Sequence, residues 1–497
     1  GLVRICDAQN NGSDAIGYLR QLITLAPDSL PVLEALEQHC HKQQHLGIAL
    51  QAYRNFLQRH PDSATVQYNY GYLLSRAGQQ HLAVAAYERA IDLGAARPEE
   101  IALNIATLYA EQLRDDVSAR LHLQRAINFN ARYVPAYFNL GCLAEQQGDR
   151  EGAQGYFEHC LALDPGYLPA LARLADAQRF TDPQAPLLLR LQHAAERSRD
   201  PDLHFALGRA LEQCGQYDAA FEHFDIANAA DRAVYRAYDP AAVAAEFDAI
   251  KARFNAGWFA QHRRDSNEVP VFICGMFRSG STLVEQILAA HSAFTPAGER
   301  EFFARLVATE LPDYPQGCDA ITATDLQQWA TRYQRESERV FGRDTRLTDK
   351  RPDNFLYLGL IKTLFPAARI IVTRRAWRDI AWSIYATRFG PGQHYATDLG
   401  AIRHYIDLQA GLVAHWQSLF GDDLYLVDYE TLVRSPKVVI AGLLEFLNEP
   451  WEDSCLAFNA LHNIVRTESV WQVRQPLYTS SVGRSNPFVA LRPDKFS

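Results

Sequence analysis

The sequence lacks the features that would place it in a membrane, secreted or nucleic-acid-binding class. No apolar run approaches the roughly 20 residues needed to span a bilayer. The first thirty residues include Asp7, Asp14 and Arg20 in place of a signal-peptide apolar core. Lys and Arg total 49 against 58 Asp and Glu, a net charge of −9, which disfavours general binding to nucleic acid or an anionic membrane. We therefore expect a cytoplasmic protein.

Paired cysteines and methionine are also scarce. The eight cysteines lie far apart and form no Cys-x-x-Cys pair, which argues against a zinc site and against a disulfide scaffold. Met276 is the only methionine, so we expect that Gly1 is not the native start. The 497 residues, 48% of them hydrophobic and 22% charged, are typical of a globular protein with about two to four domains.

The first half of the chain repeats itself at intervals of 34 to 36 residues. Small residues at positions 8 and 20 of each unit let two antiparallel helices approach closely, and an aromatic residue at position 24 is expected to fill the gap to the next repeat. This pattern resembles the tetratricopeptide repeat (TPR). The resemblance implies an all-α solenoid over residues 1–245, with a concave face that holds a protein or peptide. The clearest matches are Gly71, Ala83, Tyr87 and Ala90, then Gly141, Ala153 and Phe157, then Gly208, Ala220, Phe224 and Ala227.

A different pattern follows a predicted connecting helix and linker at 246–268. Residues 269–274 form a short apolar run typical of a buried parallel strand, and residues 283–291 have a helical pattern. Between them, glycines at 275 and 280 allow the backbone to curl around an anion at the start of the helix. We therefore predict a P-loop-like α/β domain over 269–497 with a central parallel sheet.

The loop differs from a nucleotide-triphosphate loop at one decisive position. Gly275, Gly280 and Thr282 are in the register of a Walker A motif, but Ser281 stands where its lysine belongs, and Arg278 lies before the last glycine. A phosphoryl-transfer enzyme would lose the cation that reaches the β- and γ-phosphates. A kinase or NTPase, with the strand 424–428 ending in a magnesium-binding acid, stays open as the main enzymatic alternative.

A second strand-to-helix unit ends in basic residues. The apolar run 368–373 is followed by Arg375 and, eight residues later, Ser383. An arginine and a hydroxyl can converge on one phosphate. The loop 277–282 resembles the 5′-phosphosulfate loop of sulfotransferases that use 3′-phosphoadenosine 5′-phosphosulfate (PAPS), and Arg375 and Ser383 resemble their 3′-phosphate element.

The resemblance extends over 269–484 and is strongest to tyrosylprotein sulfotransferases and their bacterial TPR-fused relatives. It implies that Glu299 is the general base, and that Arg278, Lys350 and Ser469 stabilise the transition state without a metal. Two positions depart from the family pattern: Ser485 replaces an aromatic residue and Gln475 replaces a lysine. The residues implied to bind PAPS are Arg278, Ser279, Gly280, Ser281, Thr282, Arg375, Ser383, Tyr429 and Arg484.

The predicted function is transfer of a sulfuryl group from PAPS to an acceptor hydroxyl, with a protein or peptide tyrosine as the preferred acceptor. A glycan, a lipid or a small phenol stays open as acceptor, and the repeat surface could pair two copies into a homodimer. The alternative from another class is a TPR scaffold with a non-catalytic nucleotide-binding domain.

Overall fold

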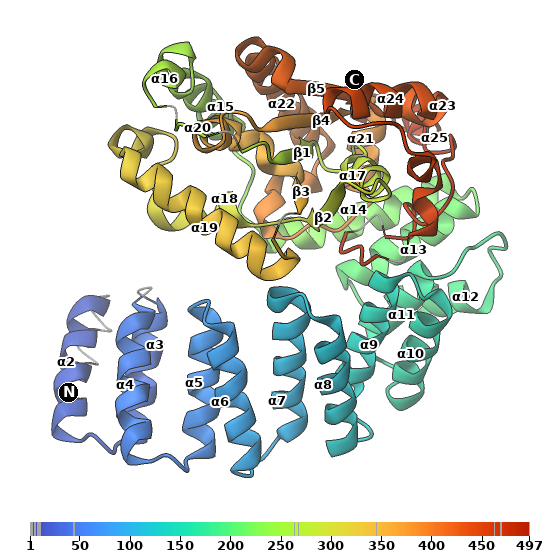
Figure 1. The fold of residues 1–497 in the computed structure, drawn as a ribbon. Helices are drawn as coiled ribbons and strands as arrows, with labels where there is room; N and C mark the ends of the chain where they lie inside the picture. Colours follow the sequence, from blue (N-terminus) through green and yellow to red (C-terminus); the bar gives the residue numbers. More distant parts are fainter. Residues whose placement is uncertain are drawn as a thin grey trace. The chain divides into compact units, whose positions relative to one another are not determined.

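The computed structural model describes residues 3, 6, 11–42, 45–262, 264–266, 268–343, 345–461, 463–467 and 470–496 (Figure 1). The contacts within the chain divide it into two compact units. The first unit comprises Gly1–Leu143 and Ala162–Pro165, and the second comprises Ala144–Leu161 and Gly166–Ser497. The second unit therefore contains the last repeat helices together with the α/β part of the chain, and the predicted domain boundaries stay a prediction.

The first unit is built from helices. Their buried faces carry small and aromatic residues, such as Ala49, Tyr53, Ala83 and Tyr87, at helical spacing. The helices are α2 (Gly12–Leu25), α3 (Leu30–Lys42), α4 (Leu46–Arg59), α5 (Ala64–Arg76), α6 (Gln80–Asp92), α7 (Pro98–Thr107), the π-helix η1 (Leu108–Leu113), α8 (Asp116–Phe129) and α9 (Val134–Gln147), whose last residues belong to the second unit.

The repeat positions read from the sequence explain how paired helices pack. A Cβ on Gly71 would lie 2.7 Å from Cδ1 of Tyr87, and a Cβ on Gly208 would lie 2.7 Å from Cε1 of Phe224. The aromatic ring at position 24 therefore lies against the glycine of its own repeat, a contact that was not expected from the sequence, which placed this ring in the gap to the next repeat. The all-α repeat architecture predicted for the N-terminal part is confirmed.

Further helices lead from the repeats into the α/β region. Several begin with Pro at the first helical turn, where its missing N–H costs nothing. They are α10 (Arg150–Leu163), α11 (Leu168–Asp176), α12 (Pro186–Ala195), α13 (Pro201–Gln213), α14 (Tyr217–Val234), α15 (Pro240–Arg253) and α16 (Ala256–Gln261).

The α/β region contains the predicted parallel sheet. Its strand order is β2-β3-β1-β4-β5, and each neighbouring pair is parallel. The central strand β1 is fully buried along its length, as expected for a sheet covered on both faces. The strands are β1 (Val271–Gly275), β2 (Phe294–Gly298), β3 (Arg346–Lys350), β4 (Arg369–Arg374) and β5 (Leu424–Asp428).

Helices cover both faces of this sheet. The α-helices are α17 (Ser281–Ala289), α18 (Phe302–Glu310), α19 (Ala323–Phe341), α20 (Leu358–Leu364), α21 (Trp377–Tyr385), α22 (Leu399–Phe420), α23 (Tyr429–Arg434), α24 (Pro436–Phe446) and α25 (Asn486–Leu491). Short 3-10 helices are η2 (Gln316–Ala320), η3 (Pro352–Leu356), η4 (Pro391–Thr397), η5 (Gly421–Asp423), η6 (Asp453–Ala460) and η7 (Pro493–Phe496).

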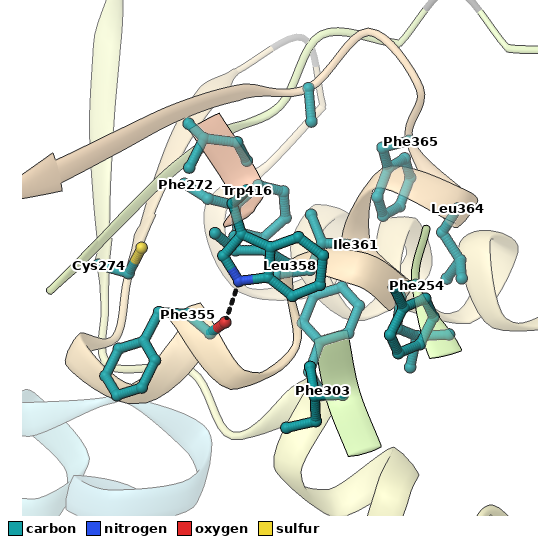
Figure 2. Close-up of a cluster of buried hydrophobic side chains, with 14 of the residues drawn as sticks. Phe254, Phe272, Cys274, Phe303, Phe355, Leu358, Ile361, Leu364, Phe365 and Trp416 are labelled. Carbon is teal, nitrogen blue, oxygen red and sulfur yellow. Dashed lines mark hydrogen bonds between the residues drawn. The ribbon is translucent and has the colours of Figure 1, made fainter. Parts of the chain in front are cut away.

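Alternate residues of β1 contribute to two separate cores. Val271 and Ile273 belong to the cluster that includes buried residues of α17 and α24, whereas Phe272 and Cys274 belong to the cluster on the other face. In that second cluster the indole Nε1 of Trp416 donates to the carbonyl oxygen of Phe355 at 2.9 Å (Figure 2). The two cores fix the sheet, and with it the direction in which the strands end.

Candidate active site

Several of the predicted functional residues lie at one edge of the sheet. The loop 275–282 follows β1, Glu299 follows β2, Lys350 ends β3, Arg375 follows β4, and Tyr429 follows β5. Because neighbouring strands are parallel, their carboxyl ends all face the same edge. Open α/β sheets bind their ligands at this edge. Residues that are far apart in the sequence are thus brought to the same edge of the sheet.

The loop after β1 is a tight backbone turn. Gly275 and Gly280 have φ values of 146° and 103°, and Arg278 adopts φ of 68°, which is uncommon for a residue with a side chain. A Cβ on Gly280 would lie 2.8 Å from Cδ2 of Tyr429. The Ser279 hydroxyl donates to the carbonyl oxygen of Met276 at 2.6 Å. The loop is therefore held in one shape directly before the N-terminus of α17, where partial positive charge favours an anion.

The second basic element meets this loop. Arg278 Nε donates to Ser383 Oγ at 2.9 Å, and Arg375 Nη1 donates to the carbonyl oxygen of Arg278 at 3.2 Å. The Arg375 guanidinium carbon lies 4.6 Å from the centre of the Tyr429 ring. The structure thus brings together four residues, from three strand ends and α21, that were predicted to bind the donor.

One polar atom in this cluster points to an anionic ligand. Arg375 Nε is buried and has no hydrogen-bond partner among the described residues. A buried donor without a partner is costly, and a charge-assisted bond to a phosphate oxygen would satisfy it. The residues present therefore fit a phosphorylated nucleotide such as PAPS, with Arg375, Arg278 and Ser383 as the residues that would hold it.

The predicted general base contacts the predicted transition-state lysine. Lys350 Nζ lies 2.5 Å from Glu299 Oε1. The lysine side chain is 0% exposed, whereas the glutamate side chain is 33% exposed. Removing one partner would leave a charge without compensation, most severely at the buried lysine. The exposed side of Glu299 can meet an acceptor while its carboxylate stays oriented by Lys350.

Sequence reasoning missed Glu285, a buried carboxyl on α17. Its Oε1 accepts a hydrogen bond from the Gly298 backbone N–H at 2.9 Å, one residue before Glu299. Burial raises the pKa of Glu285 to about 7, although the nearby Lys350 ammonium lowers it. The available signal was an acidic residue, next to Gln286, within the run Leu283–Leu288, whose other four residues are apolar.

Glu285→Gln is expected to flatten the pH dependence of stability. Because the folded-state pKa of Glu285 lies above its ordinary value of 4.5, the folded protein binds the proton more tightly, and stability falls as the pH rises from about 4.5 to about 7. The loss amounts to at most about 3 kcal/mol. Thermal unfolding at about pH 5 and about pH 8 should show a smaller difference in midpoint for the variant than for the wild type. An equal difference in both proteins would contradict the role of Glu285.

Other predicted residues have different positions. Ser281 and Thr282 are buried at the start of α17. Ser469 lies outside the described residues. Arg484 forms a bidentate ion pair with Glu212 on α13, with Nε–Oε1 and Nη2–Oε2 distances of 2.7 and 2.6 Å. The Glu212 carboxylate holds the pKa of Arg484 above its ordinary value against the effect of burial.

The two residues that depart from the family pattern, Ser485 and Gln475, differ in how many contacts they make. The Ser485 backbone N–H and hydroxyl both donate to Asp379 Oδ1, at 2.9 and 2.7 Å. Phe488, three residues later, stacks on Trp382 with ring centres 3.5 Å apart. Gln475 is exposed. Its side-chain Nε2 donates to the carbonyl oxygen of Trp471 at 3.3 Å, and its backbone N–H donates to the carbonyl oxygen of Gln472 at 3.4 Å.

The described residues lack a metal-binding cluster and a membrane-spanning helix. They contain no group of three or more His, Cys, Asp or Glu side chains placed to hold a metal ion. Among the helices that the structure describes, none is both long enough and apolar enough to cross a membrane.

Comparison with known proteins identifies the two parts of the chain. Residues 270–453 match the model of the sulfotransferase family, and residues 64–94 and 134–167 match tetratricopeptide-repeat models. An uncharacterized protein of Aquifex aeolicus (strain VF5) is 30% identical over 372 residues, which cover 67% of this chain and 46% of that protein. The chain thus spans about half the length of this curated relative.

The solved structures that match part of this chain include two sulfotransferase domains. The domain from the Synechococcus PCC 7002 olefin synthase is 18% identical and has a TM-score of 0.35, with 46% of this chain and 89% of that chain covered. The domain from the curacin biosynthetic pathway is 15% identical and has a TM-score of 0.32, with 46% of this chain and 99% of that chain covered. Residues 270–453, which contain the parallel sheet, thus match the sulfotransferase family, and the segments that match tetratricopeptide repeats precede them.

Proposed function

We propose that this protein transfers the sulfuryl group of PAPS to an acceptor hydroxyl. The observation that carries the proposal is the Glu299–Lys350 pair at the same sheet edge as the loop 275–282 and Arg375. A base, a buried cation and a phosphate-binding loop are the groups that an in-line transfer between a hydroxyl and a phosphosulfate requires.

Each residue has a defined part in the transfer. Glu299 takes the proton of the acceptor hydroxyl, whose oxygen forms a bond to sulfur while the bond between sulfur and the 5′-phosphate oxygen breaks. Lys350 and Arg278 compensate the negative charge on the transferring group and on the departing oxygen, and Ser469 is proposed to assist them. Arg375, Ser383 and Tyr429 hold the nucleotide, which leaves as 3′-phosphoadenosine 5′-phosphate. PAPS supplies the activated sulfuryl group, and the residues proposed here act without a metal.

A protein or peptide tyrosine is the acceptor that we propose. The support is the presence of tetratricopeptide repeats, which commonly bind proteins or peptides. Incubation with PAPS carrying ³⁵S should label a tyrosine-containing peptide and leave the matching phenylalanine peptide unlabelled. Labelling of a glycan, a lipid or a small phenol in place of the peptide would reject the tyrosine acceptor and keep the sulfotransferase activity.

The donor is tested by thermal unfolding with 3′-phosphoadenosine 5′-phosphate and, separately, with ATP and magnesium. A ligand at about 100 times its Kd stabilises the folded state by about 3 kcal/mol, which is several degrees for a domain of this size. We expect a shift with the bisphosphate and none with magnesium-ATP. The reverse result would favour the kinase or NTPase alternative. A shift with the bisphosphate but no turnover of any acceptor would favour the scaffold, and no shift with either ligand would reject the proposed donor.

A further inference from the structure

Two glutamates occupy the same position in two different repeats. Each lies four residues after the repeat glycine: Glu145 follows Gly141, and Glu212 follows Gly208. They lie near the ends of α9 and α13, the first helices of their repeats. Their side chains are only 8% and 10% exposed. Buried carboxylates are costly unless they are paired, so each must have a partner.

Glu212 is paired with the C-terminal segment at the donor-binding residues. Its carboxylate accepts both hydrogen bonds of the bidentate pair with Arg484. Oε1 also accepts a bond of 3.4 Å from Nε1 of Trp382, which directly precedes Ser383 on α21. The bidentate pair uses Nε and Nη2 of Arg484, and it fixes the plane of the guanidinium group.

Glu145 is paired with the same segment further along. Its Oε1 accepts a hydrogen bond of 2.9 Å from Nε1 of Trp471. The Trp471 ring also contacts Arg150, whose guanidinium carbon lies 4.5 Å from the centre of the ring. Arg474 Nη2 donates to the carbonyl oxygen of Gln146 at 2.8 Å. The end of α9 and the start of α10 thus hold residues 471–474.

The other side of this segment contacts the donor loops. Gln472, the neighbour of Trp471, accepts a hydrogen bond of 3.3 Å from Arg278 Nη2. The carbonyl oxygen of Ser481 accepts a bond from Arg375 Nη2. Gly483 donates its backbone N–H to Asp379 Oδ2 at 2.7 Å. Residues 470–485 therefore lie between the repeat glutamates and the arginines that would hold the nucleotide.

We propose that Glu145 and Glu212 are positioning residues for the donor site. Through them, the last repeats contribute to nucleotide binding by the sulfotransferase domain. They hold residues 470–485 in place so that this segment closes over the nucleotide. The inference rests on the proposed PAPS-dependent function. It also means that these two repeat positions are occupied by the chain's own C-terminal segment, so a bound acceptor has to use other surfaces of the repeats.

The test compares Glu212→Gln and Glu145→Gln with a matched control, Glu222→Gln. Glu222 is an exposed glutamate on α14, in the same repeat as Glu212. Affinity for 3′-phosphoadenosine 5′-phosphate is measured by calorimetry, and amide hydrogen exchange of residues 470–485 is measured without nucleotide. Each positioning variant should bind the bisphosphate about tenfold more weakly and exchange faster in this segment, because a hydrogen bond to a charged group is lost or weakened. The control should change neither quantity.

A further variant distinguishes the loss of the Glu145 hydrogen bond from misfolding of the Glu145→Gln protein. Trp471→Phe removes the N–H that reaches Glu145 together with part of the ring, but keeps an aromatic ring for Arg150, so it should reproduce the effect of Glu145→Gln in a folded protein. If the wild type binds the bisphosphate and all three variants bind within about twofold of it, the positioning role is wrong and the proposed function stands. If the wild type itself does not bind, the proposed function fails and this inference fails with it.

Discussion

Glu299→Gln is expected to lower kcat by about 10²- to 10⁴-fold, the contribution typical of a general base. The amide cannot accept the acceptor proton, but its oxygen can still accept a hydrogen bond from Lys350 Nζ, so the buried lysine keeps a partner. The Kd for 3′-phosphoadenosine 5′-phosphate should stay unchanged, because Glu299 is proposed to contact the acceptor and not the nucleotide. Steady-state kinetics and calorimetry on the same preparation separate the two effects.

The control for this variant is Glu301→Gln. Glu301 lies two residues further, its side chain is 75% exposed, and its ion pair with Arg351 is loose, at 3.6 Å. Such a surface pair contributes little, so kcat should stay within about twofold of the wild type. If Glu299→Gln retained full kcat, another group would be the base. If it lost the nucleotide instead, Glu299 would have a binding role.

The sequence was sufficient to predict the parts of the site that follow strand ends. Short apolar runs before the loop 275–282 and before Arg375 indicated buried parallel strands, and parallel strands place their carboxyl ends together. Arg278 and Ser383 are 105 residues apart, and no pattern near either residue indicates their contact. The rule explains it, because the loop with Arg278 and the helix with Ser383 follow the carboxyl ends of the neighbouring strands β1 and β4. The pairing of Glu299 with Lys350 is explained in the same way, since β2 and β3 are neighbours.

The sequence was insufficient where contacts depend on side chains from distant helices. Nothing near Arg484 indicated that Glu212, 272 residues earlier, would pair with it. Residues 246–268 are predicted from the sequence to be a connecting helix and linker, mainly because residues 261–268 are polar. In the structure, Phe247 and Phe254 are buried in the core beside the sheet, and Phe254 packs so closely on Gly359 that a Cβ there would lie 2.2 Å from its ring. Such complementarity is set by packing and is not visible in one sequence.

Ser485 illustrates a departure that the structure explains. An aromatic residue was expected there from the family resemblance, and its absence put the C-terminal segment in doubt. The buried serine instead pairs with Asp379 on α21, and Phe488 supplies the ring that packs on Trp382. The hydrogen bonds of Ser485 and the stacking of Phe488 on Trp382 both fix this segment to α21, the helix that carries Ser383.

Arg375→Gln is expected to weaken binding of 3′-phosphoadenosine 5′-phosphate by about 100-fold, the equivalent of about 3 kcal/mol, as for a charged hydrogen bond lost from a buried site. Arg375 has a buried Nε without a hydrogen-bond partner among the described residues, and its guanidinium carbon lies 4.6 Å from the centre of the Tyr429 ring. Glutamine is too short to span this position and carries no charge. Calorimetric titration of the bisphosphate measures the effect.

The neighbouring arginine is the matched control for this variant. Arg374 ends β4 one residue earlier and is exposed, so Arg374→Gln removes the same charge from almost the same place. If Arg375 acts only through the general positive potential of this edge, the two variants should weaken binding equally, and salt should reduce both effects. If Arg375 binds a phosphate directly, only Arg375→Gln should lose about 100-fold, and adenosine 5′-phosphosulfate, which lacks the 3′-phosphate, should bind both variants alike. The second pattern is the one that the buried Nε of Arg375, without a hydrogen-bond partner among the described residues, predicts.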